Sequence, residues 1–229
     1  MMVGREIAHA STKAGVAAVV CIAPIVVTLA LAFANAGMRE ALIGAFIAQR
    51  VSGLILHNTE HTPRAVEMMR RSGLPVIETG DITRRPVDMN ISYSNFNAAK
   101  AMTLHLAARG HRTIGFVSLA TRTNRRARER QRGFLAALRS LGRSPDARLI
   151  MEVGPGMTSG AHAMVEMTSR VPAVDAIFFA GDVLAVGALM ETQRRRWSIP
   201  RRIALAGFDD LEILQHAVPR VTCLRLPRL

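Results

Sequence analysis

Aromatic residues and cysteines are scarce in this sequence, and each shortage narrows what the protein can do. Aromatics make up 4% of the chain, which argues against the base-stacking platforms that bind single-stranded nucleic acid. The two cysteines, Cys21 and Cys223, lie far apart and lack the spacing of a metal site. They favour a reducing compartment, in which disulfides are rare.

Motifs of the common enzyme classes are also missing. The chain contains no G-x-S-x-G nucleophile elbow, no P-loop and no G-x-G-x-x-G dinucleotide motif. His57 and His61 have the spacing of a helical metal pair, but His57 falls at the expected end of a strand and no third ligand is near in the sequence. The sequence therefore predicts no enzymatic activity, no catalytic residue, no metal site and no cofactor.

Acidic residues are outnumbered by basic ones. The chain has 17 Asp and Glu against 30 Lys and Arg, nearly all of them Arg, and the net charge is +13. This balance favours contact with anions, including nucleic acid, although a general preference for Arg over Lys is the favoured explanation. The basic stretch 122–132 predicts at most salt-sensitive, non-specific DNA binding. A hydrophobic content of 49% is typical of a globular chain with a substantial core.

Charge is absent between Lys13 and Arg39, and three interpretations of this apolar segment are open. It is long enough to span a bilayer. It also resembles a signal peptide, because basic residues precede it and the small-residue sites 32–34 and 34–36 follow it. Pro24 interrupts the run, however, and much of it is Ala and Val. A buried first strand and helix of an α/β core is therefore the favoured interpretation.

Short apolar runs alternate with amphipathic stretches along the rest of the chain, as in βαβ units with parallel sheets. Helices are expected between the strands, with Thr62, Ser94 and Asp182 as caps. Two such sets meet near residues 117 and 118. The sequence thus predicts an α/β fold with two doubly wound parallel-sheet subdomains: an apolar segment 1–37, a first subdomain 38–117, a second subdomain 118–218 and a crossover segment 219–229. The expected strands are 51–56, 75–78, 87–92, 113–117, 149–153, 176–180, 203–206 and 221–224.

Polar side chains gather where the expected strands end, which is where open α/β sheets bind ligands. Arg130 lies at the start of a helix near the junction of the two sets. Carboxylates accept hydrogen bonds from sugar hydroxyls, and an arginine fork holds a carboxylate or a pair of hydroxyls. The set suits a polyhydroxylated small molecule, neutral or anionic, although each member is equally well explained as a cap or a solvated group. The strand-end residues are His57, Asn58, Glu78, Asp81, Ser118, Thr121, Asp182, Asp209 and Asp210.

From about Gly37 to Pro227 the chain resembles the effector-sensing domain of LacI/GalR-type bacterial transcription regulators. Within that family, the branch that the chain resembles most is the gluconate-utilisation repressors, on the stretches His61-Thr-Pro-Arg64, Pro75-Val-Ile-Glu78 and Ser94-Asn-Phe96. The stretches that carry the family resemblance are Arg50-Val-Ser-Gly-Leu-Ile-Leu56, Gly73-Leu-Pro-Val-Ile-Glu78, Ala108-Arg-Gly-His-Arg-Thr-Ile-Gly-Phe116, Arg130-Gln-Arg-Gly-Phe134, Ala176-Ile-Phe-Phe-Ala-Gly-Asp-Val-Leu-Ala-Val-Gly187 and Ile203-Ala-Leu-Ala-Gly-Phe-Asp-Asp210.

The resemblance implies a two-lobed, periplasmic-binding-protein-like fold with a sugar or sugar-acid effector in the cleft between the lobes. Carried over by motif, Arg130 holds the effector, Asp209 binds its hydroxyls and Glu78 lines the first-lobe side. Asp182 matches the family's Asn-Asp pair, but its Asn position is Gly181 here, so one hydrogen-bond donor is missing.

The resemblance also implies a cytoplasmic homodimer that controls transcription by binding operator DNA through a separate helix-turn-helix, which is not present in this chain. The match to the family is incomplete at both ends. Residues 14–34 do not match the family's first strand and helix, and the family continues beyond the strand at 221–224. The alternative is an exported or membrane-anchored sugar-binding protein of the same fold. An enzyme acting on sugar acids is a weaker third hypothesis, because only the strand-end carboxylates support it.

Overall fold

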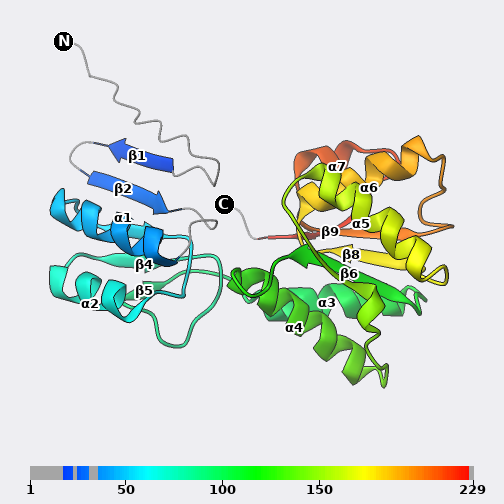
Figure 1. The fold of residues 1–229 in the computed structure, drawn as a ribbon, viewed down its shortest axis with the longest axis horizontal. Coiled ribbons are helices and arrows are strands. Elements are labelled where there is room, and N and C mark those ends of the chain that lie inside the picture. The colour runs from blue at the N-terminus through cyan, green and yellow to red at the C-terminus, as the bar shows by residue number, and fades with distance from the viewer. Residues whose placement is uncertain (1–17, 23–24, 31–35, 227–229) are drawn as a thin grey trace, which may run out of the picture. The chain divides into compact units, whose positions relative to one another are not determined.

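The computed structural model describes residues 18–22, 25–30 and 36–226 (Figure 1). Its contacts divide the chain into two compact units, Met1–Tyr93 and Ser94–Leu229. Each unit has its own sheet, so the α/β class and the two sets of βαβ elements predicted from the sequence are confirmed.

The first unit contains a five-stranded sheet in the order β1-β2-β3-β4-β5. The pairing of β1 with β2 is antiparallel, whereas the other neighbours are parallel. The helices α1 and α2 bury their apolar residues with those of β3 and β4 in one core. The elements are β1 (Ala18–Ile22), β2 (Ile25–Ala30), α1 (Ala36–Ala48), β3 (Leu54–Leu56), α2 (Pro63–Ser72), β4 (Val76–Glu78) and β5 (Met89–Asn90).

Local signals explain where α2 begins and ends. The Thr62 side chain accepts a hydrogen bond from the backbone N–H of Ala65 at 3.1 Å, and Pro63 occupies the first turn, where its missing N–H costs nothing. Gly73 ends the helix with a φ of 67°, a conformation that glycine adopts without strain. The predicted cap and stop of this helix are confirmed.

The apolar segment is built differently from what the sequence predicted. Its described parts, 18–22 and 25–30, form two antiparallel strands rather than a strand followed by a helix. The predicted burial of this segment concerns side chains that lie outside the described part of the structure. Within the part of the chain that the structure describes, no helix is both long and apolar enough to cross a membrane.

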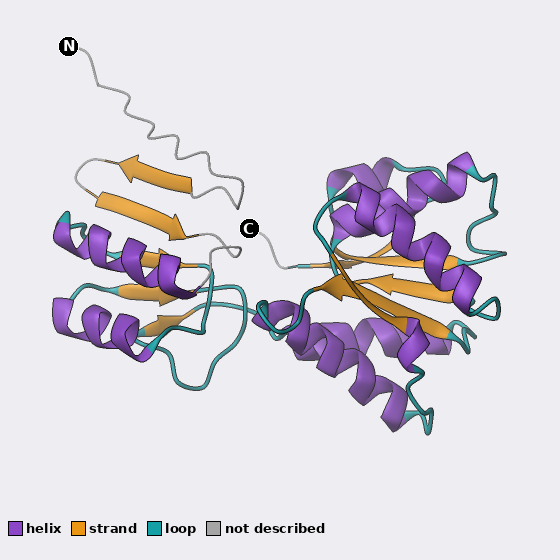
Figure 2. Ribbon diagram, viewed as in Figure 1, coloured by secondary structure: helices purple, strands orange, loops and turns teal. Residues whose placement is uncertain are grey.

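The second unit contains a fully parallel sheet in the order β10-β9-β8-β6-β7. Helices α3 and α4 cover one face, and α5 and α6 cover the other (Figure 2). The chain runs from β6 outward to β7 and then returns to β8 on the other side of β6, so the topological switch point lies between β6 and β8. The elements are α3 (Asn95–Ala108), β6 (Ile114–Leu119), α4 (Arg125–Ser140), the 3-10 turn Ala147–Leu149, β7 (Ile150–Val153), α5 (Met157–Arg170), β8 (Ala176–Phe179), α6 (Asp182–Arg194), β9 (Ala204–Asp209), α7 (Glu212–His216) and β10 (Thr222–Arg225).

Three glycines set the spacing of the helix pairs. A Cβ on Gly133 of α4 would overlap the carbonyl oxygen of Phe96 in α3. On the other face, a Cβ on Gly160 of α5 would overlap a carbonyl oxygen of α6, and one on Gly187 of α6 would overlap a carbonyl oxygen of α5. Both pairs therefore meet backbone against backbone.

The division between Tyr93 and Ser94 differs from the predicted boundary between residues 117 and 118. The physical reason is that α3 is bound to α4 through the close approach at Gly133, while β6 pairs with β8 and β7 inside the second sheet. Helix α3 and strand β6 therefore both belong to the second unit, whereas the sequence predicted them in the first subdomain.

Candidate functional site

The side chain of Arg130 lies buried at the carboxyl ends of β8 and β9, with 7% of its surface exposed. Its Nε donates a hydrogen bond to Asn95 Oδ1 at 2.7 Å, and its Nη1 donates one to the carbonyl oxygen of Ala180, also at 2.7 Å. The guanidinium lies over the Phe208 ring, 3.5 Å from its centroid, as in a cation–π contact. Three elements of the second unit thus fix the plane of this cation.

Aromatic rings in stacked and edge-to-face contacts pack beneath the Arg130 guanidinium. Phe178 lies between Phe208 and Phe116, with ring centroids 6.4 Å and 5.6 Å away, and Phe116 stacks on Phe134 of α4 at 5.0 Å. All four rings are fully buried, so they connect the guanidinium to the core of the second unit.

Asp209 is a predicted site residue whose carboxylate lies beside this cation. Its Oδ1 lies 4.0 Å from Arg130 Nη2, and 34% of its side chain is exposed. Asp209 has a φ of 108° and Asp210 a φ of 60°, and two consecutive non-glycine residues in this region indicate backbone strain. The strained turn directs the Asp209 side chain toward Arg130, whereas Asp210 Oδ2 accepts a hydrogen bond from Arg225 Nε at 2.7 Å.

Asp182 lies inside the second unit, and its predicted role as a helix cap is wrong. The cap of α6 is Gly181, and Asp182 is the first helical residue. Its side chain is 2% exposed, and its Oδ2 accepts a hydrogen bond from the N–H of Leu211 at 2.5 Å. This hydrogen bond ties the carboxylate to the turn after β9, so Asp182 does not cap the start of α6. Its predicted contact with an effector stays a prediction.

The surroundings of Asp182 favour its neutral form. Burial raises the pKa of Asp182 to about 6; the hydrogen bond from Leu211 opposes this, and the nearby carboxylates of Asp209 and Asp210 add to it. A Cβ at Gly207 would lie 2.5 Å from Asp182 Oδ1 and 3.0 Å from the Cys223 sulfur, so only glycine leaves room for this carboxylate. Burial likewise raises the pKa of the Cys223 thiol to about 12, which makes it unreactive.

Glu78 lies in the first unit, and both of its carboxylate oxygens are hydrogen-bonded within that unit. Oε1 is 2.9 Å from His61 Nε2, Oε2 accepts a bond from the N–H of Val87 at 2.7 Å, and the residue is 1% exposed. His57 bonds to Thr79 Oγ1 instead, at 2.9 Å. The two histidines therefore have separate partners, and the described residues contain no group of three His, Cys, Asp or Glu that could hold a metal ion.

Sequence reasoning missed Asn95, the carbonyl of Ala180 and the ring of Phe208 as partners of Arg130. Ser94 was predicted as the cap of α3, and its Oγ accepts a bond from Asn97 N at 3.1 Å. An amide side chain directly after a cap residue, where it is not needed for capping, is a signal that could have pointed to Asn95. Other strand-end residues have different partners: Asn58 closes a turn on Thr59 and Glu60, Ser118 bonds to the carbonyl of Leu119 within β6, and Thr121 bonds to Glu152 of β7.

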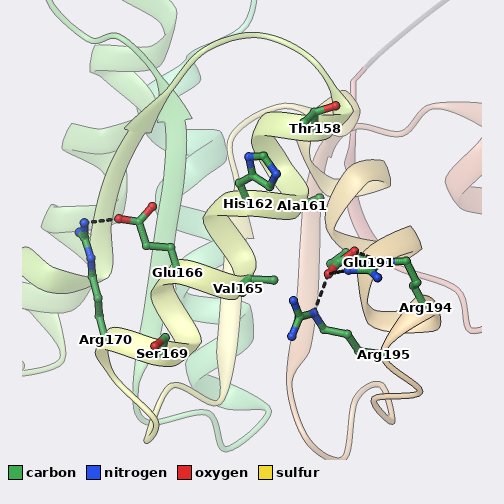
Figure 3. Close-up of a pocket in the computed structure, with 10 residues that line it drawn as sticks. All are labelled: Thr158, Ala161, His162, Val165, Glu166, Ser169, Arg170, Glu191, Arg194 and Arg195. Atoms are coloured by element: carbon green, nitrogen blue, oxygen red, sulfur yellow. Dashed lines mark hydrogen bonds and ion pairs between the residues drawn. The ribbon is translucent and has the colours of Figure 1, made fainter.

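A separate open groove of about 780 Å³ runs between α5 and α6 (Figure 3). Ion pairs occupy its walls, with Glu166 bound to Arg170, and with Glu191 bound to Arg194 and Arg195 at 2.6 Å. These two arginines lower the pKa of Glu191 to about 2. The groove contains none of the four predicted site residues.

Comparison with known proteins agrees with this geometry. Residues 103–228 match the periplasmic binding protein-like domain. The HTH-type transcriptional regulator GntR of Escherichia coli strain K12 is 32% identical over 191 residues, which cover 83% of this chain and 57% of that protein. The crystal structure of the transcription regulator GntR from Chromobacterium violaceum superimposes with a TM-score of 0.76 at 30% identity, covering 82% of this chain and 69% of that one.

A ligand-bound structure is also similar. The complex of the transcriptional regulator CelR with cellobiose gives a TM-score of 0.72 at 27% identity, covering 83% of this chain and 59% of that one. These relatives are transcription regulators and not enzymes, as the sequence predicted. The chain spans a little over half of the length of the GntR protein of Escherichia coli. Matched over more than half of its residues by the domain family, the chain belongs to the periplasmic binding protein-like family, as an effector-binding domain of the LacI type.

Proposed function

We propose that this chain is the sensing part of a transcription regulator, and that Arg130 and Asp209 bind a sugar or sugar acid. The observation that carries the proposal is the pairing of a fixed guanidinium with a half-exposed carboxylate, 4.0 Å apart, at the carboxyl ends of β8 and β9. The position beside the switch point of the parallel sheet is the one where open α/β sheets bind ligands.

The chemistry of the pair suits a polyol. The guanidinium donates hydrogen bonds in one plane, and the carboxylate accepts them, so adjacent hydroxyl groups can bond to both. A ligand carboxylate would bond to the guanidinium in the same plane. Phe208 adds an apolar surface under the cation.

A sugar acid such as gluconate is the proposed effector, with a neutral sugar as the second candidate. The similarity to GntR proteins supports the first, and the bound cellobiose of CelR supports the second. We further propose that the regulator works as a cytoplasmic homodimer and binds operator DNA through a helix-turn-helix outside this chain. Glu78 and Asp182 are kept as proposed effector-binding residues on motif grounds.

Thermal unfolding with a panel of aldonates and neutral sugars tests the proposal. A ligand present at 100 times its Kd stabilises the native state by about 2.7 kcal/mol, which raises Tm by several degrees. Arg130→Lys and Asp209→Asn should abolish the shift, whereas Arg132→Lys, at an exposed position on the same helix, should keep it. A panel in which no ligand shifts the wild-type Tm refutes the proposal.

A further inference from the structure

A concentrated patch of arginines covers the end of α6 and the turn that follows it. All of its arginines are exposed, and the single tryptophan of the chain, Trp197, lies among them in the sequence. No acidic residue occurs between positions 192 and 208. The members of this arginine patch are Arg194, Arg195, Arg196, Arg201 and Arg202.

Ion pairs within the molecule leave most of this charge uncompensated. Arg194 and Arg195 both bind Glu191 at 2.6 Å, so one carboxylate serves two cations (Figure 3). In the part of the chain that the structure describes, no acidic side chain lies within ion-pair distance of the three others. Cations are favourable at a helix C-terminus, which explains the first two arginines. That explanation does not extend to Arg201 and Arg202, which lie beyond the helix.

The contacts of Trp197 show which part of a polyanion suits the patch. The guanidinium of Arg202 lies over the ring, 3.8 Å from its centroid, and that of Arg195 lies 5.6 Å from it. The ring is therefore covered by cations and is not an open platform on which bases could stack. A guanidinium donates its hydrogen bonds in its own plane, so a ring against its face leaves the edge donors suited to phosphate oxygens.

We propose that the arginine patch is a docking surface for the phosphate backbone of duplex nucleic acid, bound without sequence preference. Phosphates arranged along a duplex present a dense row of anions, and contacts to them carry no sequence information. A second copy of the chain is a poor partner, because its net charge of +13 repels the patch. The patch lies at the opposite end of α6 from Asp182, about 18 Å away along the helix axis, and is thus separate from the proposed effector site.

Titration of the full chain into two labelled duplexes of unrelated sequence tests this inference. Fluorescence anisotropy gives the affinity at several salt concentrations, and a change in Trp197 fluorescence reports contact at the patch. The two affinities should agree within about twofold and should fall steeply with salt. Arg196→Gln combined with Arg201→Gln leaves the contact of Arg202 with Trp197 in place. This double variant should bind at least about tenfold more weakly at low salt, with a salt slope lower by about 1.8, at 0.9 for each lost phosphate contact.

Arg122→Gln combined with Arg139→Gln is the matched control, because it lowers the net charge equally at exposed positions of the same unit. Its affinity should stay within about threefold of the wild type, and circular dichroism checks that both double variants are folded. Equal losses in the two double variants would assign the binding to overall charge and overturn the inference. It is also overturned if neither duplex binds at low salt, or if polyglutamate binds as tightly as a duplex, which would indicate an acidic protein as the partner.

Discussion

Replacing Asp182 by asparagine should stabilise the second unit at neutral pH. The folded-state pKa of Asp182 is about 6, above its ordinary value of 3.8, so the native state binds a proton more tightly than the unfolded state does. The contribution of this group to the free energy of unfolding is therefore fully present below pH 4 and is lost as the pH rises to about 6. Above that pH the wild type keeps a buried negative charge that Asp182→Asn lacks.

The size of the effect follows from the difference between the two pKa values. A difference of about 2 units corresponds to about 3 kcal/mol, at 1.36 kcal/mol per unit, and this is an upper bound. Asparagine has the same shape, and its oxygen can still accept the bond from the N–H of Leu211. We therefore expect the variant to be more stable than the wild type by about 2–3 kcal/mol at pH 7.5, and to be nearly equal to it at pH 4.

Urea unfolding followed by Trp197 fluorescence measures this difference. Trp197 is the single tryptophan of the chain, and it belongs to the second unit, where it packs 3.8 Å from the Arg202 guanidinium. Asp146→Asn is the control. Arg148 holds the pKa of Asp146 below its ordinary value, so the substitution should destabilise the protein at neutral pH instead of stabilising it. If the wild type and Asp182→Asn show the same change of stability between pH 4 and pH 7.5, the buried charge has been misassigned.

Three further variants test other parts of the structure. Gly133→Ala should destabilise the second unit by about 1–3 kcal/mol in urea, because its Cβ overlaps a carbonyl oxygen of α3, and a loss no larger than that of Ala136→Gly would contradict the close approach. Gly181→Asn should be tolerated, since nothing lies within 4 Å of a Cβ there. It should raise the affinity for the effector about three- to tenfold, because it restores the amide that the family has at this position. An unchanged Kd in titration calorimetry would count against that role. Glu78→Gln should weaken the first unit by about 1–3 kcal/mol, seen as faster hydrogen exchange in α2 and β4, because the bond to His61 is compromised; unchanged exchange would show that the buried pair contributes little.

Elements with local signals could be predicted from the sequence. The caps Thr62 and Ser94 act on backbone groups three residues away, so the starts of α2 and α3 were readable without a fold. Continuous apolar runs likewise located the buried strands β8 and β9. Of the candidate site, the strand-end pattern placed Arg130 and Asp209 in one set of polar residues, and the family resemblance gave each its role; their contact could not be predicted, since 79 positions separate the two residues in the sequence.

Features that depend on distant partners could not be predicted. Asp182 has the sequence signature of a helix cap, but a backbone N–H 29 residues away binds its carboxylate. Asn95 looks like an ordinary residue of a helix start until Arg130 is placed beside it. The pairing of β1 with β2 was missed because an apolar run without alternation does not distinguish a hairpin from a strand and a helix.

The glycine contacts between helices have a mechanical consequence. Where two helix backbones are in direct contact, a small shift brings their atoms into collision. Helix α3 therefore cannot slide along α4, nor α5 along α6. The second unit should therefore respond to a ligand as a stiff body. The two strained residues, Asp209 and Asp210, lie at the end of β9 and outside these helix contacts. A ligand that binds at the end of β9 would then displace the second unit as a whole, because shear within its helical layers is blocked.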